Sequence, residues 1–138
     1  MKLRIYTDGG SRGNPGPAAS GAVLKEVRGT EEGETVATAS KFLGVTTNNQ
    51  AEYVAIIIGL KKAIALGATE VELYMDSELA CKQLKGEYKV KNPEIAERFL
   101  EVKNLFHSFK QVHLQHIRRE RNKEADAIVN KVLDEAAS

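Results

Sequence analysis

The first third of the chain alternates apolar and polar residues, a pattern typical of β-strands with one buried face. In residues 2–8, for example, Leu3, Ile5 and Thr7 fall on one face and the side chains between them on the other. A run bounded by glycines at 29–33 predicts a hairpin turn. These patterns predict an antiparallel meander of three strands, at residues 2–8, 18–27 and 34–44.

After the third strand the apolar residues follow the spacing of a helix and no longer that of a strand. Thr47 is predicted to cap this helix in a capping box: its hydroxyl meets the Gln50 amide, and the Gln50 side chain reaches back to Thr47. The helix should end near Leu66, because Gly67 can adopt the left-handed conformation that often follows a last helical residue.

The second half of the chain alternates helices with strands, which favours parallel strand pairing. The expected strands and helices lie at residues 71–76 and 112–116 and at residues 77–84, 93–109 and 125–136, respectively. No linker or internal repeat interrupts this order. The sequence therefore predicts an α/β fold with a five-stranded mixed sheet, in a single domain spanning 1–138.

The chain has 138 residues, enough for one domain with its own core, and an ordinary globular composition of 42% hydrophobic and 28% charged residues. No apolar run approaches the length of a membrane span, and the polar start leads into a strand and not into a signal peptide. We therefore expect no membrane partner and a cytoplasmic location. The single cysteine, Cys81, excludes an internal disulfide and a thiolate zinc site.

The formal net charge is +1, so a polyanionic partner would have to be held by local basic patches and not by the overall field. Neither a dinucleotide-binding fingerprint nor a P-loop occurs in the sequence.

Two carboxylates follow predicted strands in near-twin contexts, since Asp8 follows RIYT and Asp76 follows ELYM. If these strands are parallel neighbours, the two side chains lie roughly 5 Å apart at the carboxyl edge, where open α/β sheets keep their ligands. Glu52 and Asp126 also sit where predicted helices begin. Carboxylates without basic partners repel one another unless cations lie between them. The pattern therefore predicts a divalent-metal site.

The longer motifs carry a resemblance to a known family. Asp8 begins DGGSRGNPGP, Thr46 begins TTNNQAE, Ser77 follows Asp76, and Asn122 begins NKEAD. In this order and at these spacings, the chain closely resembles the ribonuclease H family, type 1, over essentially its whole length.

The resemblance implies a sheet with strand order 3-2-1-4-5, strands 1–3 antiparallel and helices on both faces. It implies hydrolysis of the RNA strand of RNA–DNA hybrids, leaving 5′-phosphate and 3′-hydroxyl ends. Two Mg²⁺ ions, with Mn²⁺ as a substitute, are the expected cofactors. The implied metal ligands are Asp8, Glu52, Asp76 and Asp126.

His116 precedes Asp126 by ten positions and matches a family histidine proposed to help activate water or eject product. The alternative is a strand-end histidine with a satisfied hydrogen bond. The sequence around His116 also lacks the glycine-flanked loop of many members.

Substrate contacts are expected from the turn at 9–17, whose glycines let the backbone approach a minor groove. A Thr47 that caps its own helix has less to offer a DNA phosphate, and Glu78 replaces a glutamine that relatives often carry. The resemblance assigns substrate binding to Gly9, Ser11, Gly13, Asn14, Thr47, Asn48 and Asn49.

Two basic patches could hold phosphates, although runs of charge are also common on solvated faces. The chain has no tryptophan and lacks the basic handle of some relatives. The first patch combines Tyr88 with Lys82, Lys85, Lys89 and Lys91; the second comprises Arg118, Arg119 and Arg121. Hybrid affinity should therefore be modest and fall strongly with salt.

Two other functions remain open. The run 9–13 matches G-x-S-x-G, and Ser11, Asp76 and His116 follow the order of a hydrolase triad, although a nucleophile elbow must enter a helix after its serine. The second is a hybrid-binding module of the same fold with weak or no catalysis. A monomer is the default expectation for either.

Overall fold

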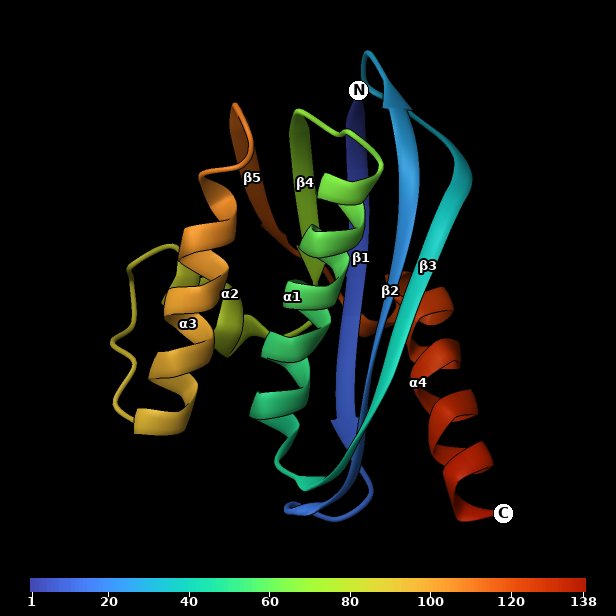
Figure 1. The fold of residues 1–138 in the computed structure, drawn as a ribbon, viewed down its shortest axis with the longest axis vertical. Coiled ribbons are helices and arrows are strands. Elements are labelled where there is room, and N and C mark those ends of the chain that lie inside the picture. The colour runs from blue at the N-terminus through green and yellow to red at the C-terminus, as the bar shows by residue number, and fades with distance from the viewer.

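The computed structural model describes residues 1–138, and its strands form one sheet in the order β3-β2-β1-β4-β5 (Figure 1). The β1–β2 and β2–β3 pairs are antiparallel, whereas the β1–β4 and β4–β5 pairs are parallel. The predicted strand order and directions are therefore confirmed. The strands are β1 (Lys2–Ser11), β2 (Gly16–Arg28), β3 (Glu31–Thr46), β4 (Glu70–Met75) and β5 (Gln111–His116).

Helices lie on both faces of the sheet, as predicted. Figure 1 shows α1 with α2 and α3 on one side and α4 on the other. A single 3₁₀ turn, η1 (Arg119–Arg121), leads into the last helix. The helices are α1 (Asn48–Ala65), α2 (Glu78–Leu84), α3 (Pro93–Phe106) and α4 (Lys123–Ala137).

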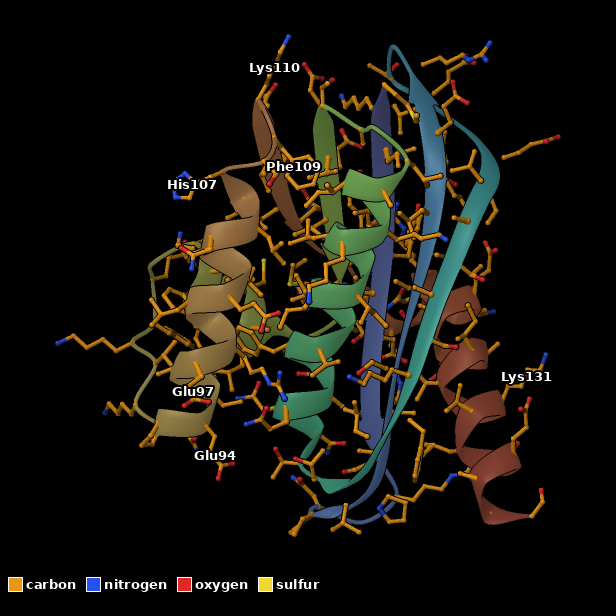
Figure 2. All side chains as sticks on the ribbon, viewed as in Figure 1. Glu94, Glu97, His107, Phe109, Lys110 and Lys131 are labelled. Carbon is orange, nitrogen blue, oxygen red and sulfur yellow. The ribbon has the colours of Figure 1, made fainter.

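The main hydrophobic core fills the space between the sheet and α1. Leu3 and Ile5 of β1 are fully buried there against Ile56 and Leu60 of α1. Figure 2 shows the side chains that fill this layer, with the buried Phe109 between the end of α3 and β5. Since strand side chains alternate faces, burial of the odd-numbered residues of β1 directs the even-numbered ones to the face that α4 partly covers.

Most predicted boundaries differ from the observed ones by one to three residues, and two of the differences lie near residues discussed below. β1 continues past residue 8 through Ser11, which pairs with Ala18, so the predicted turn at 9–17 shrinks to residues 12–15. The helix predicted at 93–109 ends at Phe106, because residues 107–109 turn into the start of β5. Neither change moves a predicted site residue away from the carboxyl edge of the sheet.

The start and end of α1 follow the predicted signals, with one difference. The Thr47 hydroxyl accepts a hydrogen bond from the Gln50 amide at 3.2 Å, and Gly67 has a φ of +83°. The Gln50 side chain does not reach back to Thr47, however, and instead accepts a hydrogen bond from Arg98 of α3 at 3.1 Å. Half of the predicted capping box is thus replaced by a link between helices.

None of the helices is both long enough and apolar enough to cross a membrane.

Candidate active site

An open cleft of about 450 Å³ lies at the carboxyl edge of β1 and β4, beside the start of α1 and along α4. All four acids singled out by the sequence line it, and only two of its lining residues are hydrophobic. The lining residues are Asp8, Gly9, Gly10, Ser11, Arg12, Asn48, Glu52, Asp76, Arg119, Asp126, Val129, Asn130 and Leu133.

Parallel pairing of β1 with β4 brings two of the acids together. Tyr6 pairs with Tyr74, and their rings lie 5.3 Å apart between centroids, edge to face. The last registered pair is Thr7 with Met75, so Asp8 and Asp76 occupy the next position on each strand. The predicted strand neighbours are confirmed, and both carboxylates line the same cleft.

Glu52 reaches the cleft because α1 lies very close to β1. A β-carbon built on Gly9 would come within 2.4 Å of the backbone of Ala51 and Glu52. Any side chain at position 9 would therefore push the helix off the strand. The buried Ser20 hydroxyl also donates to the Ala51 carbonyl at 2.6 Å, which fixes the same turn of α1.

Asp126 reaches the cleft from the opposite face, in the first turn of α4. A β-carbon on Gly21, which pairs with Asp8, would approach Ile128 to 2.9 Å and the Ala125 carbonyl oxygen to 3.2 Å. This close contact fixes α4 over the sheet. Within α4, the Asn130 amide donates to the Asp126 carboxylate at 3.3 Å.

A buried asparagine joins the two halves of the site. The Asn122 side-chain amide donates to the Thr7 carbonyl at 2.9 Å and to the Asp76 carboxylate at 3.1 Å. Asn122 belongs to the NKEAD motif, but its role was missed at the sequence level. The signal was not local, because the Thr7 carbonyl that it binds lies 115 positions earlier in the chain.

The electrostatics of the cleft disfavour four ionised carboxylates in the absence of cations. No ion pair joins any of the four to a lysine or arginine. Burial, followed by the charges of Asp76, Asp126 and Glu52, raises the pKa of Asp8 to about 8. Burial also raises the pKa of Glu52 to about 7, against the opposing effect of a hydrogen bond from Ser77.

The donor set of the cleft fits a hard divalent cation. Mg²⁺ prefers oxygen ligands and keeps several waters, so one or two carboxylates for each ion are enough. The side chains as they lie do not place three or more acids or histidines around a common point. The acids line the walls of an open cleft instead, an arrangement that leaves room for waters and phosphate oxygens.

The predicted substrate residues divide into two groups. Gly9, Ser11 and Asn48 line the cleft. The Asn48 side-chain oxygen accepts from the Ser11 amide at 2.8 Å and from the Ser11 hydroxyl at 3.0 Å. Asn14 is joined to this network, since its side-chain oxygen accepts from the Asn48 amide at 3.1 Å. The loop at residues 12–15 is thereby tied to the start of α1.

The other substrate residues, Gly13, Thr47 and Asn49, do not line the cleft. Thr47 caps α1, as described above. Asn49 is half-buried, and its side-chain oxygen is enclosed without a hydrogen-bond partner. Their roles in substrate binding therefore stay predictions.

Two arginines, Arg12 and Arg119, line the cleft beside the acids, and His116 does not. His116 is exposed at the end of β5 and does not line the cleft, whereas Arg119 of η1 does. Arg119 makes no ion pair, in contrast to Arg12, which binds Asp134 of α4 at 2.6 Å. His107 is exposed at the end of α3, at the opposite end of the molecule from the tip of β1 (Figure 2).

The first predicted basic patch is partly neutralised. Lys82 pairs with Glu78 at 2.9 Å and lies over the Tyr88 ring, 5.0 Å from its centroid. The remaining lysines of the patch are exposed and unpaired: Lys85, Lys89 and Lys91. Arg118 and Arg121, the other members of the second patch, are exposed beside Arg119.

A triad centred on Ser11 is wrong for this chain. Ser11 ends β1 and is followed by a bend and another strand, so no helix follows it as a nucleophile elbow requires. Its hydroxyl donates to Asn48, and His116 does not share its cleft.

Comparison with known proteins agrees with the fold and the cleft. Residues 6–132 match the family described as reverse transcriptase-like. The bifunctional protein Rv2228c of Mycobacterium tuberculosis is 43% identical over 138 residues, which cover 99% of this chain and 37% of that protein. Ribonuclease HI of Halobacterium salinarum is 41% identical over 135 residues, covering 98% of this chain and 66% of that one.

The crystal structure of LC11-RNase H1 in complex with an RNA/DNA hybrid superposes with a TM-score of 0.90 at 41% identity, covering 99% of both chains. The chain spans little more than a third of the mycobacterial relative. The chain belongs to the reverse transcriptase-like family and, within it, to the type 1 ribonucleases H.

Proposed function

We propose that the chain is a divalent-metal-dependent endonuclease that hydrolyses the RNA strand of RNA–DNA hybrids and leaves 5′-phosphate and 3′-hydroxyl ends. One observation carries the proposal: four carboxylates from four separate segments of the chain line one cleft and form no ion pair with a basic side chain. Membership of the type 1 ribonucleases H supports it, as does the hybrid bound to LC11-RNase H1.

Two Mg²⁺ ions, or Mn²⁺ in their place, would supply a deprotonated water and neutralise the charge that develops on the phosphate and the leaving oxygen. Asp8, Glu52, Asp76 and Asp126 would hold them. Asp8 is electrostatically the most central of the four, because the charges of all three other acids raise its pKa. In the absence of cations, Asp8 keeps its proton at neutral pH and so limits the repulsion within the cleft.

Arg119 is suited to neutralise the phosphate beside the acids. Its guanidinium can bind two phosphate oxygens at once and forms no ion pair with a carboxylate of the chain. The role of His116 in water activation or product release stays a prediction, because His116 does not line the cleft. The observed geometry favours Arg119.

Recognition of RNA is proposed to depend on the network of Ser11, Asn14 and Asn48. The Asn48 oxygen is used by Ser11, so its two amide hydrogens remain to donate to a sugar or base edge. Thr47 can serve two purposes, because a hydroxyl that accepts from Gln50 still has its own proton to donate to a DNA phosphate. The remaining predicted contacts are Gly9, Gly13 and Asn49.

The decisive experiment follows cleavage of a labelled RNA–DNA hybrid in Mg²⁺, in Mn²⁺ and in EDTA. The wild-type chain should cut only the RNA strand, only with a divalent cation, and Asp8→Asn should abolish cutting. Glu97→Gln, an exposed acid at the start of α3 (Figure 2), is the matched control and should keep full activity. Equal cleavage by wild type and Asp8→Asn would contradict the proposal.

The runner-up is a hybrid-binding module with weak or no catalysis. The same experiment separates the two, because such a module would bind hybrid in a gel-shift assay but cut it in none of the metal conditions. Activity that survives EDTA would contradict both functions.

A further inference from the structure

Asn122 lies where the pairing of β1 with β4 ends, next to Asp8 and Asp76. The β1–β4 ladder ends with Thr7 opposite Met75, one residue before the acids. The next link between the strands is made by a side chain, since the amide of Asn122 donates to the Thr7 carbonyl on one strand and to the Asp76 carboxylate on the other. Asn122 thus continues the strand pairing by one step, at the position of the acids.

The orientation of this amide is determined by its partners. A side-chain amide has two N–H donors, and both are used, on a carbonyl and a carboxylate. Turning it over would direct its oxygen at the same two acceptors. In the observed orientation the oxygen is instead enclosed without a partner, in a residue that is 1% exposed. An unsatisfied buried oxygen destabilises the fold, so the residue is poorly explained by stability alone.

The backbone of Asn122 also fixes a third acid. Its carbonyl accepts a hydrogen bond from the Asp126 amide at 3.1 Å, in the first turn of α4. One residue therefore contacts Asp76 directly, the carbonyl preceding Asp8, and the backbone of Asp126. Glu52 is fixed separately, through the close approach of α1 to Gly9.

We propose that Asn122 is a positioning residue that holds the Asp76 carboxylate in register with Asp8 and Asp126 for binding of a divalent cation. This inference rests on the proposed metal-dependent function. It concerns geometry and not contact with substrate, because Asn122 is buried and does not line the cleft. Removing its amide should weaken cation binding and turnover and leave hybrid affinity unchanged.

The test is a calorimetric titration of Mg²⁺ into the hybrid-free chain. It is carried out for the wild type and for Asn122→Ala. Loss of the amide should raise the Mg²⁺ dissociation constant roughly tenfold, the lower end of what partners of metal ligands contribute. In hybrid cleavage, kcat should fall while KM for the hybrid stays within about twofold, because no substrate contact is lost.

A destabilised fold needs its own control. Asn92 caps α3 by accepting hydrogen bonds from the Glu94 and Ile95 amides at 2.8 and 3.2 Å, and it does not line the cleft. Asn92→Ala should lower the thermal midpoint without changing the Mg²⁺ dissociation constant. Equal Mg²⁺ affinity in wild type and Asn122→Ala, or an equal loss in Asn92→Ala, would overturn the inference.

A measurement on the wild type keeps the inference testable if Asn122→Ala does not fold. The Asn122 side-chain amide protons should exchange slowly with solvent and shift on addition of Mg²⁺ in ¹⁵N-resolved NMR spectra, whereas those of Asn92 should not shift. If Mg²⁺ binds but the Asn122 signal does not shift, the positioning role is overturned and the proposed function is not. A wild type that binds no Mg²⁺ and cuts no hybrid would overturn the proposed function as well.

Discussion

Two groups of charges lie on the α4 face of β1 and β4, and they are organised in opposite ways. In the middle of the strands, Arg4 binds Glu72 at 2.8 Å and Glu32 at 3.3 Å, and Lys2 binds Glu72 at 3.3 Å. Burial acts to raise the pKa of Glu72, but hydrogen bonds from Arg4 and Lys2 outweigh it and lower the pKa. This group is neutralised within the protein.

At the carboxyl end of the same strands, Asp8 and Asp76 have no basic partner, and the pKa of Asp8 rises to about 8. Asp76 follows Glu72 by only four positions and comes directly after the last residue of β4. The difference shows that the sheet can accommodate acids by pairing them and does not do so at this edge. No ion pair within the chain balances the acids there, which is the physical basis for proposing cation binding.

The largest expected effect is the loss of activity in Asp76→Asn. Removal of one of the charges proposed to hold the cations should reduce hybrid cleavage on the order of 10³-fold. The variant should fold at least as well as wild type without metal, because a repelling charge is gone. Steady-state cleavage of a labelled hybrid measures this loss of activity. Activity within tenfold of wild type would contradict the difference between the paired acids and the acids of the cleft.

The metal-free protein should become less stable as the pH rises from about 5 to about 8. The pKa values of Asp8 and Glu52, about 8 and about 7, exceed their ordinary values, so the native state holds protons that the unfolded chain has released. The stabilisation that these bound protons give is fully present below the ordinary pKa values. It is lost as the pH rises through the pKa values of the folded state. Each pKa unit between the folded and unfolded states corresponds to about 1.4 kcal/mol, so the loss should amount to several kcal/mol.

Urea unfolding in EDTA at a series of pH values measures this loss. Asp8→Asn should flatten the profile, and Mg²⁺ should stabilise the wild type more at pH 8 than at pH 5. Stability that rises over this range in EDTA would mean that the acids are compensated within the protein after all.

Arg119→Ala should lower turnover about tenfold and reduce the slope of log affinity against log salt by about one, the effect of one lost phosphate contact. Arg118→Ala, an exposed neighbour that does not line the cleft, provides the comparison for turnover. Equal turnover in the two variants would exclude a special position for Arg119. A hybrid affinity that does not depend on salt would contradict both basic patches.

The smallest expected effect concerns the paired group. Glu72→Gln leaves Arg4 and Lys2 without their shared partner and should cost roughly 1 kcal/mol of unfolding free energy at neutral pH. Hybrid cleavage should not change, because Glu72 lies outside the cleft. Chemical denaturation and the cleavage assay together measure the two effects. A stabilised variant would show that these ion pairs do not offset the burial of their charges.

Much of this arrangement could be predicted from local sequence. Strand alternation placed Asp8 and Asp76 on one face, and the Thr47 cap located the start of α1, because both depend on neighbours along the chain. The parts that were missed depend on contacts between distant elements. The Asn122 amide and the Gln50–Arg98 bond have partners 115 and 48 positions away, which no local pattern reveals.

The extension of β1 through Gly9 and Gly10 was missed for a related reason. Consecutive glycines favour a turn. Gly9 is nevertheless required in the strand, because α1 lies so close that a β-carbon at position 9 would overlap the helix backbone. The contrast between Arg119 and His116 likewise depends on how the chain turns after β5, where η1 directs residue 119 to the cleft.

Our main claim is that the cleft takes up divalent cations in exchange for protons held by Asp8 and Glu52. Its most direct measurement is the calorimetric titration of Mn²⁺ into metal-free protein at pH 7.5, in two buffers of different ionisation enthalpy, for wild type and Asp8→Asn. The wild type should bind Mn²⁺ and release protons, since Asp8 and, to a smaller extent at this pH, Glu52 hold them in the free cleft. Asp8→Asn should do neither to a comparable extent. Binding without proton release, or equal binding by Asp8→Asn, would contradict the claim.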